Sequence, residues 1–96
     1  MLDTVQTTFT ICVQRNVNGT YTLAGLVNEE SLSDAAVLEL QIKDEAGFFK
    51  KVRETEMDEF RYFEMTQLQL ESGDLDHLYL KLKELDILEK VEFTDN

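Results

Sequence analysis

The sequence predicts an α+β fold: a single small domain spanning residues 1–96, in which a mostly antiparallel sheet opens with a β-hairpin and one C-terminal helix, at about 74–86, packs on the sheet. Three observations predict this fold. Apolar and polar residues alternate through the N-terminal segments, and a leucine stripe near the C-terminus recurs at helical spacing. An apolar content of 43% in 96 residues is enough for one modest core.

The hairpin is predicted from two alternating segments, residues 8–13 and 20–27, with a turn ending at Gly19 between them. A two-residue turn would divide the larger apolar side chains between the two faces. A three-residue loop, with Gly19 left-handed in a G1 bulge, pairs Val13 with Leu23 and keeps those side chains on one face, so this register is predicted. The residues on that face are Phe9, Ile11, Val13, Tyr21, Leu23 and Val27.

Three further strands are predicted, at residues 36–43, about 48–54 and about 60–70. In the first of them, apolar and polar residues alternate. A helix capped by Ser31 or Ser33 is the alternative there, and the period of two favours the strand. A turn ending at Gly47 follows this strand, and an acidic turn separates the next two.

The C-terminal helix is predicted from apolar residues at spacings of three and four. They are Leu75, Leu78, Tyr79, Leu82 and Leu85. Asp74 precedes this stripe as an N-cap. A strand through Leu78, Leu80 and Leu82 is the alternative, but the lack of β-branched residues and the capping aspartate favour the helix. A short final strand is expected at 91–93.

Charge is distributed unevenly along the chain. Twenty acidic and nine basic residues give a net charge of −11, while residues 1–28 hold only Asp3 and Arg15 and are therefore neutral. An acidic chain repels nucleic acid, because affinity for phosphates comes from Lys and Arg. We therefore expect no direct nucleic-acid binding. We expect a basic protein as partner, a class to which nucleic-acid-binding enzymes belong.

No catalytic or metal motif is evident, so we expect neither an enzyme nor a cofactor. His77 is the sole histidine, and no CxxC, HExxH or EF-hand spacing occurs. Cys12 has no basic neighbour that would lower the pKa of its thiol, and we expect it to pack beneath whatever covers its sheet face. The longest apolar stretch, 23–27, is too short for a membrane span. With no signal peptide expected and a single cysteine, a cytoplasmic location is predicted.

Carboxylates are the remaining candidates for a functional surface. The seven candidate partner-binding residues are Glu54, Glu56, Asp58, Glu59, Glu71, Asp74 and Asp76. On an extended segment, alternate carboxylates lie about 6.8 Å apart. DNA carries a charge about every 3.4 Å along each strand, so such a row of carboxylates approaches half the charge density of a DNA strand. We therefore expect an inhibitor or nucleic-acid-mimicking decoy that occupies a basic surface of a nuclease or related effector, of the phage counter-defence or toxin-immunity type. The alternative is a non-enzymatic accessory or assembly subunit that makes contact through its neutral N-terminal hairpin edge.

Overall fold

The computed structural model describes residues 8–33 and 35–91, which form seven strands and one short 3₁₀ helix. The strands are β1 (Phe9–Arg15), β2 (Tyr21–Val27), β3 (Val37–Lys43), β4 (Phe49–Glu56), β5 (Tyr62–Leu68), β6 (Leu78–Leu82) and β7 (Ile87–Lys90). The 3₁₀ helix η1 (Ser72–His77) connects β5 to β6. All strand pairings are antiparallel. They build a three-stranded sheet in the order β1-β2-β5 and a four-stranded sheet in the order β4-β3-β6-β7.

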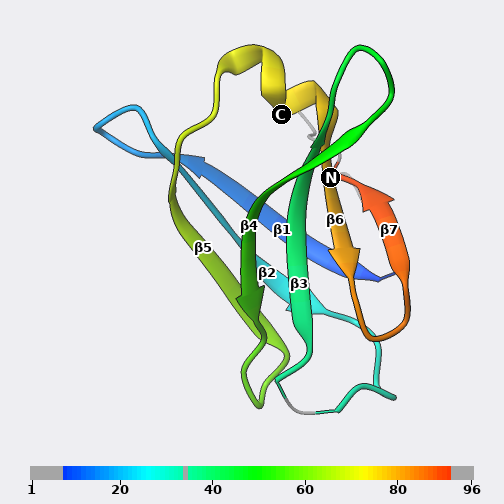
Figure 1. Cartoon of the computed structure of the whole chain (residues 1–96). Helices are drawn as coiled ribbons and strands as arrows, with labels where there is room; N and C mark the ends of the chain where they lie inside the picture. Colours follow the sequence, from blue (N-terminus) through cyan, green and yellow to red (C-terminus); the bar gives the residue numbers. More distant parts are fainter. Residues whose placement is uncertain (1–7, 34, 92–96) are drawn as a thin grey trace, which may run out of the picture.

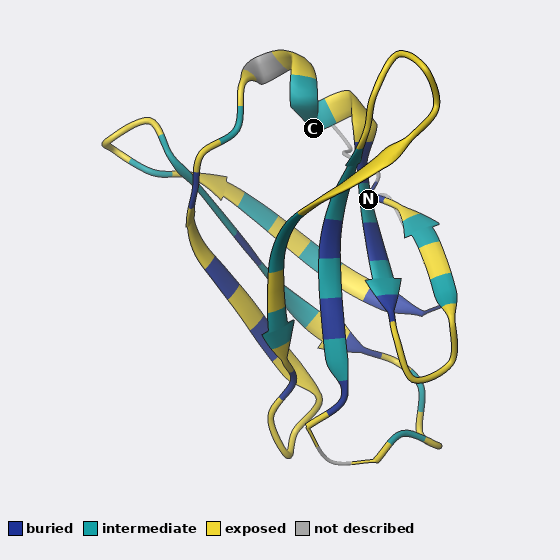
Figure 2. Cartoon of the chain, viewed as in Figure 1, coloured by how far each residue is buried: buried dark blue, intermediate teal, exposed yellow. Residues whose placement is uncertain are grey.

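The two sheets face each other and bury one core between them (Figure 1). Buried positions alternate with more exposed ones along β3 and β5, as expected for strands with one face inward (Figure 2). The three-stranded sheet contributes Phe9, Leu23, Val27, Phe63, Met65 and Leu68 to the core. The four-stranded sheet contributes Leu38, Leu40, Leu78, Leu80 and Leu82. Each fully buried leucine or phenylalanine adds roughly 1.5–3 kcal/mol of favourable transfer free energy.

The predicted hairpin is confirmed, including its register. Val13 pairs with Leu23 and Phe9 pairs with Val27 along an unbroken β1–β2 ladder. Gly19 has a φ of 87°, and its N–H donates to the carbonyl oxygen of Asn16 at 3.1 Å, as in a type I turn closed by a left-handed residue. The strand predictions at 36–43, 48–54 and 60–70 are confirmed as β3, β4 and β5.

Four turns between consecutive strands share this geometry. In each of them, the fourth residue donates its N–H to the carbonyl oxygen of the first and has a positive φ. The fourth residues are Gly19, Gly47, Arg61 and Asp86, with φ values of 87°, 91°, 63° and 54°. Two of the four are therefore not glycine and carry a side chain in a region that L-residues disfavour.

The prediction of a C-terminal helix is wrong, and the fold class is all-β rather than α+β. In the predicted range only η1 is helical, and Asp74 lies inside η1 instead of capping a longer helix. The chain then extends as β6 and returns as β7. The final strand predicted at 91–93 lies earlier, at Ile87–Lys90; Val91 follows it, and the other two positions fall outside the described residues.

The alternating pattern decides the structure of β6. Leu78, Leu80 and Leu82 are all completely buried and face the opposite sheet. β6 pairs with β3 on one side and with β7 on the other, so both edges of its backbone are hydrogen-bonded. A helix here would have left β3 without a neighbour on that side. Leu85, the last residue of the supposed stripe, lies in the exposed β6–β7 turn.

Candidate functional site

Glu54 lies among lysines on the outer face of the four-stranded sheet. Lys51 Nζ lies 3.4 Å from Glu54 Oε1, and Lys83 Nζ lies 3.4 Å from Glu54 Oε2. The same lysine lies 3.3 Å from Glu39 Oε2, and Gln41 donates to the other oxygen of Glu39 at 3.0 Å. Two glutamates and two lysines balance one another in this network. Glu54 is therefore paired within the chain and does not continue a free ladder of carboxylates.

The pKa values of this network show the same pairing. Partial burial acts to raise the pKa of Glu39, but hydrogen bonds from Gln41 and Lys83 outweigh it and hold that pKa below its ordinary value of 4.5. The hydrogen bonds that Lys83 makes to Glu39 and then to Glu54 raise the pKa of Lys83 above its ordinary value of 10.5. Both groups are charged over the whole neutral range, so the network stays paired there.

Asp58 fixes the turn between β4 and β5. Its Oδ1 accepts hydrogen bonds from the backbone N–H groups of Phe60 and Tyr62, both at 2.9 Å, and its own N–H donates to the carbonyl oxygen of Tyr62 at 2.8 Å. This clamp holds the intervening residues on a defined backbone. As a result, Glu59 and Phe60, which is 74% exposed, project from an ordered turn.

Three loops gather at this end of the sandwich: 28–36, 57–61 and 83–86 (Figure 1). Hydrogen bonds tie them together. Met57 N–H donates to the carbonyl oxygen of Ala36 at 3.0 Å, and Ser33 N–H donates to Glu84 Oε2 at 3.0 Å. The Ser33 hydroxyl donates to the same carboxylate.

We call the described residues of these loops, together with Glu56, the acidic end. It carries seven acidic residues against Arg61 and Lys83. The seven are Glu29, Glu30, Glu56, Asp58, Glu59, Glu84 and Asp86. Hydrogen bonds from the Ser33 hydroxyl and N–H hold the pKa of Glu84 below its ordinary value, so this carboxylate stays charged.

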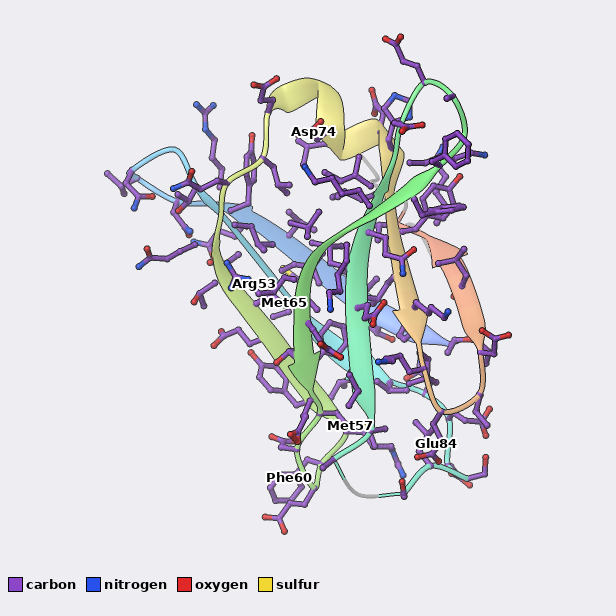
Figure 3. All side chains as sticks on the ribbon, in the orientation of Figure 1. Arg53, Met57, Phe60, Met65, Asp74 and Glu84 are labelled. Atoms are coloured by element: carbon purple, nitrogen blue, oxygen red, sulfur yellow. The ribbon has the colours of Figure 1, made fainter. Side chains whose placement is uncertain are left out.

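The other predicted residues lie at the opposite end of the molecule. Glu71 precedes η1 and donates its N–H to Asp74 Oδ2 at 3.0 Å, while Asp76 is exposed on η1. Asp74 and Phe60 mark the two ends in Figure 3. The predicted set of seven therefore does not form one surface. It divides into Glu54 in the lysine network, three residues at the acidic end, and three at the opposite end.

Formal charge does not distinguish the two ends. The loops at the opposite end, residues 16–20, 44–48 and 69–77, hold five acidic residues and no Lys or Arg, for a net −5 that matches the seven acids and two bases of the acidic end. Among the described residues, however, no hydrogen bond joins one of these three loops to another. The acidic end is thus the more rigidly preorganised of the two.

A shallow groove lies over the outer face of the three-stranded sheet. Its volume is about 430 Å³, and its lining includes Cys12, Ala24, Leu26 and Tyr62. The expectation that Cys12 packs beneath a cover is wrong for the described residues, since its side chain is exposed. The groove is almost entirely apolar, and no Lys, Arg, Asp or Glu lines it.

Candidate metal-binding and nucleophilic side chains lie apart in the described residues. Among residues 8–33 and 35–91, no three His, Cys, Asp or Glu side chains lie close enough together to hold a metal ion. His77 is exposed on η1, far along the chain from the exposed thiol of Cys12. In the same part of the chain, no helix has the length and apolar character needed to cross a membrane.

Comparisons with protein-family models, with curated proteins and with solved structures found no match for this chain.

Sequence reasoning missed most of the acidic end. It did not select Phe60, nor the carboxylates contributed by the other two loops. One signal could have found them: in an antiparallel sandwich, alternate loops return to the same end, so the second, fourth and sixth connections meet. Using that rule requires the right strands in order, but the predicted helix took the place of β6, and the final strand was predicted beyond the position of β7.

Proposed function

We propose that this chain is a non-enzymatic, acidic protein that inhibits a nuclease or related effector by placing its acidic end on the partner's basic, nucleic-acid-binding surface. The observation that supports this most is the linkage of three loops by hydrogen bonds into one surface with seven carboxylates. Binding to a preorganised surface loses less conformational entropy. A cytoplasmic location is part of the proposal, because the single cysteine is a free, exposed thiol, as is common in reducing compartments.

Phe60 gives this surface an apolar anchor. Interfaces draw most of their affinity from a few buried aromatic residues surrounded by polar contacts, and Phe60 stands between Glu59 and Arg61 with 74% of its surface exposed. The carboxylates attract a basic partner over long range, and the aromatic ring then fills a recess between basic side chains or stacks on an arginine. Glu54 is not part of the proposed contact surface, because it is already paired with lysines.

Two variants with the same net charge test the location of the contact. The first, Glu56→Gln/Asp58→Asn/Glu59→Gln, neutralises the acidic end and keeps an Oδ1 acceptor for the β4–β5 turn. The second, Glu71→Gln/Asp74→Asn/Asp76→Asn, neutralises the opposite end and keeps a side-chain oxygen at position 74 for the Glu71 N–H. Each removes three of the negative charges and changes the net charge from −11 to −8.

The partner is captured from extracts of the native host with the immobilised chain, identified, and purified. Its affinity for both variants is then measured by calorimetry at about 0.05 M and about 0.5 M salt, where screening differs strongly. We expect the acidic-end variant to bind at least about tenfold more weakly and with a flatter salt dependence, while the opposite-end variant stays close to wild type. Equal losses in both variants would mean that only overall charge matters, and would contradict the proposed location.

Phe60→Ala provides a second test, with Phe48→Ala as its control. Phe48 is 71% exposed and lies in the β3–β4 turn at the opposite end, so the two substitutions remove the same side chain from similar surroundings. A hot-spot aromatic costs at least about 2 kcal/mol of binding free energy when truncated. We expect this loss for Phe60→Ala alone. Partner binding that is unaffected by Phe60→Ala excludes Phe60 as an anchor.

A further inference from the structure

The four sheet edges of this molecule are protected to very different degrees. β4 carries Lys50, Lys51, Arg53 and Glu54, and its pairing with β3 is interrupted by an irregularity between Leu40 and Gln41. β7 is only four residues long and ends in Glu89 and Lys90. Charges, bulges and short length are the usual means by which edge strands avoid pairing with other chains.

The edge of β5 is also occupied in part. Arg53 reaches from β4 and donates from Nη1 to the carbonyl oxygen of Thr66 at 3.0 Å. Gln67, the next residue, has a φ of 53°, which disturbs the extended backbone. β1 has none of these features. It is seven residues long, its ladder with β2 is unbroken, and it has no charged residue before Arg15.

The hydrogen-bond pattern shows which backbone groups of β1 are not used in pairing with β2. Asn28 N–H donates to the carbonyl oxygen of Thr8 at 2.7 Å, and Asn16 N–H donates to that of Thr20 at 2.7 Å. Even-numbered residues of β1 therefore direct their backbone N–H and C=O groups towards β2. Odd-numbered residues direct these groups to the other side of the strand. Those residues are Phe9, Ile11, Val13 and Arg15. Among the described residues, no strand pairs with that side of β1.

We propose that the edge of β1 that no described strand covers binds the β1 strand of a second copy of this chain, in antiparallel orientation, around a two-fold axis at Cys12. The two three-stranded sheets then form one continuous six-stranded sheet. The proposed dimer does not depend on the proposed function. It places a second copy of this chain at the N-terminal hairpin edge, which is the contact surface expected of an accessory or assembly subunit. A dimer built on one self-complementary patch is the commonest form of oligomer.

The register follows from the strand itself. When Cys12 faces its own copy, all seven residues of both strands are paired, and the free odd-numbered residues face one another: Ile11 pairs with Val13 of the second copy and Phe9 with Arg15. A shift by two residues in either direction leaves part of each strand unpaired. On the outer face, Thr10 meets Gln14 of the second copy. Charges of the same sign never lie opposite each other in this register, which would be destabilising.

Charge limits where a second copy can bind. Two copies with a net charge of −11 repel each other through their acidic parts, whereas residues 1–28 are neutral and contain β1. Pairing through β1 brings the neutral hairpins of the two chains together, so no like charges face each other within the contact.

Cross-linking at Cys12 tests the register. Residues facing each other at a non-hydrogen-bonded position have Cα atoms about 4.5 Å apart, within the range that a disulfide spans. We expect mild oxidation with diamide to join two wild-type chains. Thr10→Cys in a Cys12→Ser background should not cross-link, because residue 10 and its copy are about 14 Å apart along the strands. Adding Gln14→Cys to that variant should restore the cross-link. If Thr10→Cys cross-links as well as wild type, the proposed register is wrong.

Two lysine substitutions test the dimer itself in sedimentation equilibrium. Cys12→Lys places two like charges face to face across the two-fold axis, whereas Gln14→Lys makes the same charge change opposite Thr10. Both positions are exposed, so both variants should fold. We expect wild type and Gln14→Lys to sediment at twice the 11.1 kDa mass of the chain, and Cys12→Lys to dissociate at least about tenfold more readily. A wild-type chain that remains single at about 1 mM, where even a weak contact would be populated, overturns the proposal.

Discussion

Both sheets present apolar faces to the shared core but differ on their outer faces. The four-stranded sheet carries a network of glutamates and lysines outward, and its charges pair with one another. The outer face of the three-stranded sheet carries a groove whose lining includes Thr10, Cys12 and Leu26 and no charged residue. The net charge is concentrated instead in the loops at the two ends. Net charge therefore does not locate a contact surface, because it includes charges that are already paired within the chain.

The largest expected effect concerns the feature that both sheets share. Leu23 in β2 and Leu82 in β6 are each completely buried, one in each sheet. Leu23→Ala and Leu82→Ala should each cost about 2–5 kcal/mol in the free energy of unfolding, because both leave a cavity in the common core. Urea denaturation measures this loss. If only one of the two destabilises the chain, the sheets do not share one core.

A close approach of two strands is particular to the three-stranded sheet. A Cβ atom added at Gly25 would lie 2.1 Å from the backbone carbonyl oxygen of Thr10, whereas one added at Gly73 would meet no atom within 4 Å. Gly25→Ala should therefore cost about 1–3 kcal/mol or more, because β1 must move. Gly73→Ala is the control and should be close to neutral. Thermal denaturation compares them, and equal melting temperatures would contradict the close β1–β2 packing.

The next prediction concerns backbone strain, with an expected change of about 1 kcal/mol in the free energy of unfolding. Arg61 has a φ of 63° at the position where Gly47 has 91° in the turn at the opposite end. Arg61→Gly should stabilise the chain by about 1 kcal/mol, because glycine adopts a positive φ without the steric penalty of a Cβ. Chemical denaturation measures the gain. A loss of stability would show that the Arg61 side chain makes contacts that outweigh its strain.

The smallest expected effect belongs to the paired charges of the four-stranded sheet. The folded chain lowers the pKa of Glu39 from 4.5, so this contribution to stability is present above that pH and is lost as the pH falls through the folded-state pKa. It raises the pKa of Lys83 from 10.5, so that contribution is present below that pH and is lost as the pH rises through the folded-state pKa.

Lys83→Met removes the pairing of Lys83 with Glu39 and with Glu54 and leaves both glutamates in place. Its urea midpoint should differ slightly from that of wild type, by a constant amount across neutral pH, and the difference should shrink at the acid and alkaline extremes. A difference that is largest at the extremes would contradict the pairing of Lys83 with the two glutamates.

The sequence predicted the elements whose signals are local. The turn at Gly19 and the face shared by Val13 and Leu23 were enough to define the hairpin register, and alternation defined β3. The C-terminal region was not predictable in this way, because Leu78 and Leu82 fit both a helical and an alternating pattern. Pairing with β3 and β7 decides between them, and these partners are distant or follow later in the sequence.

The candidate site was predictable only in part, for a similar reason. Glu54 and Glu56 lie close together in the acidic run, yet Glu54 is paired with Lys83, 29 residues away, whereas Glu56 is exposed at the acidic end. Local sequence shows a run of charges but not which of them find a partner. The turn formed by Asp58 was foreseen as acidic, but its role in holding Phe60 outward follows from backbone hydrogen bonds.

The salt dependence of self-association tests most directly the claim that the neutral sheet, and not the acidic surface, brings two copies together. Sedimentation equilibrium of the wild-type chain gives the dimer dissociation constant at about 0.05 M and about 0.5 M salt, between which screening changes strongly. No ion pair lies in the β1–β1 contact, and salt screens the repulsion between the two negatively charged chains. The dissociation constant should therefore stay the same or fall as salt rises. A dimer that dissociates as salt is added would be held by opposite charges and would contradict this assignment.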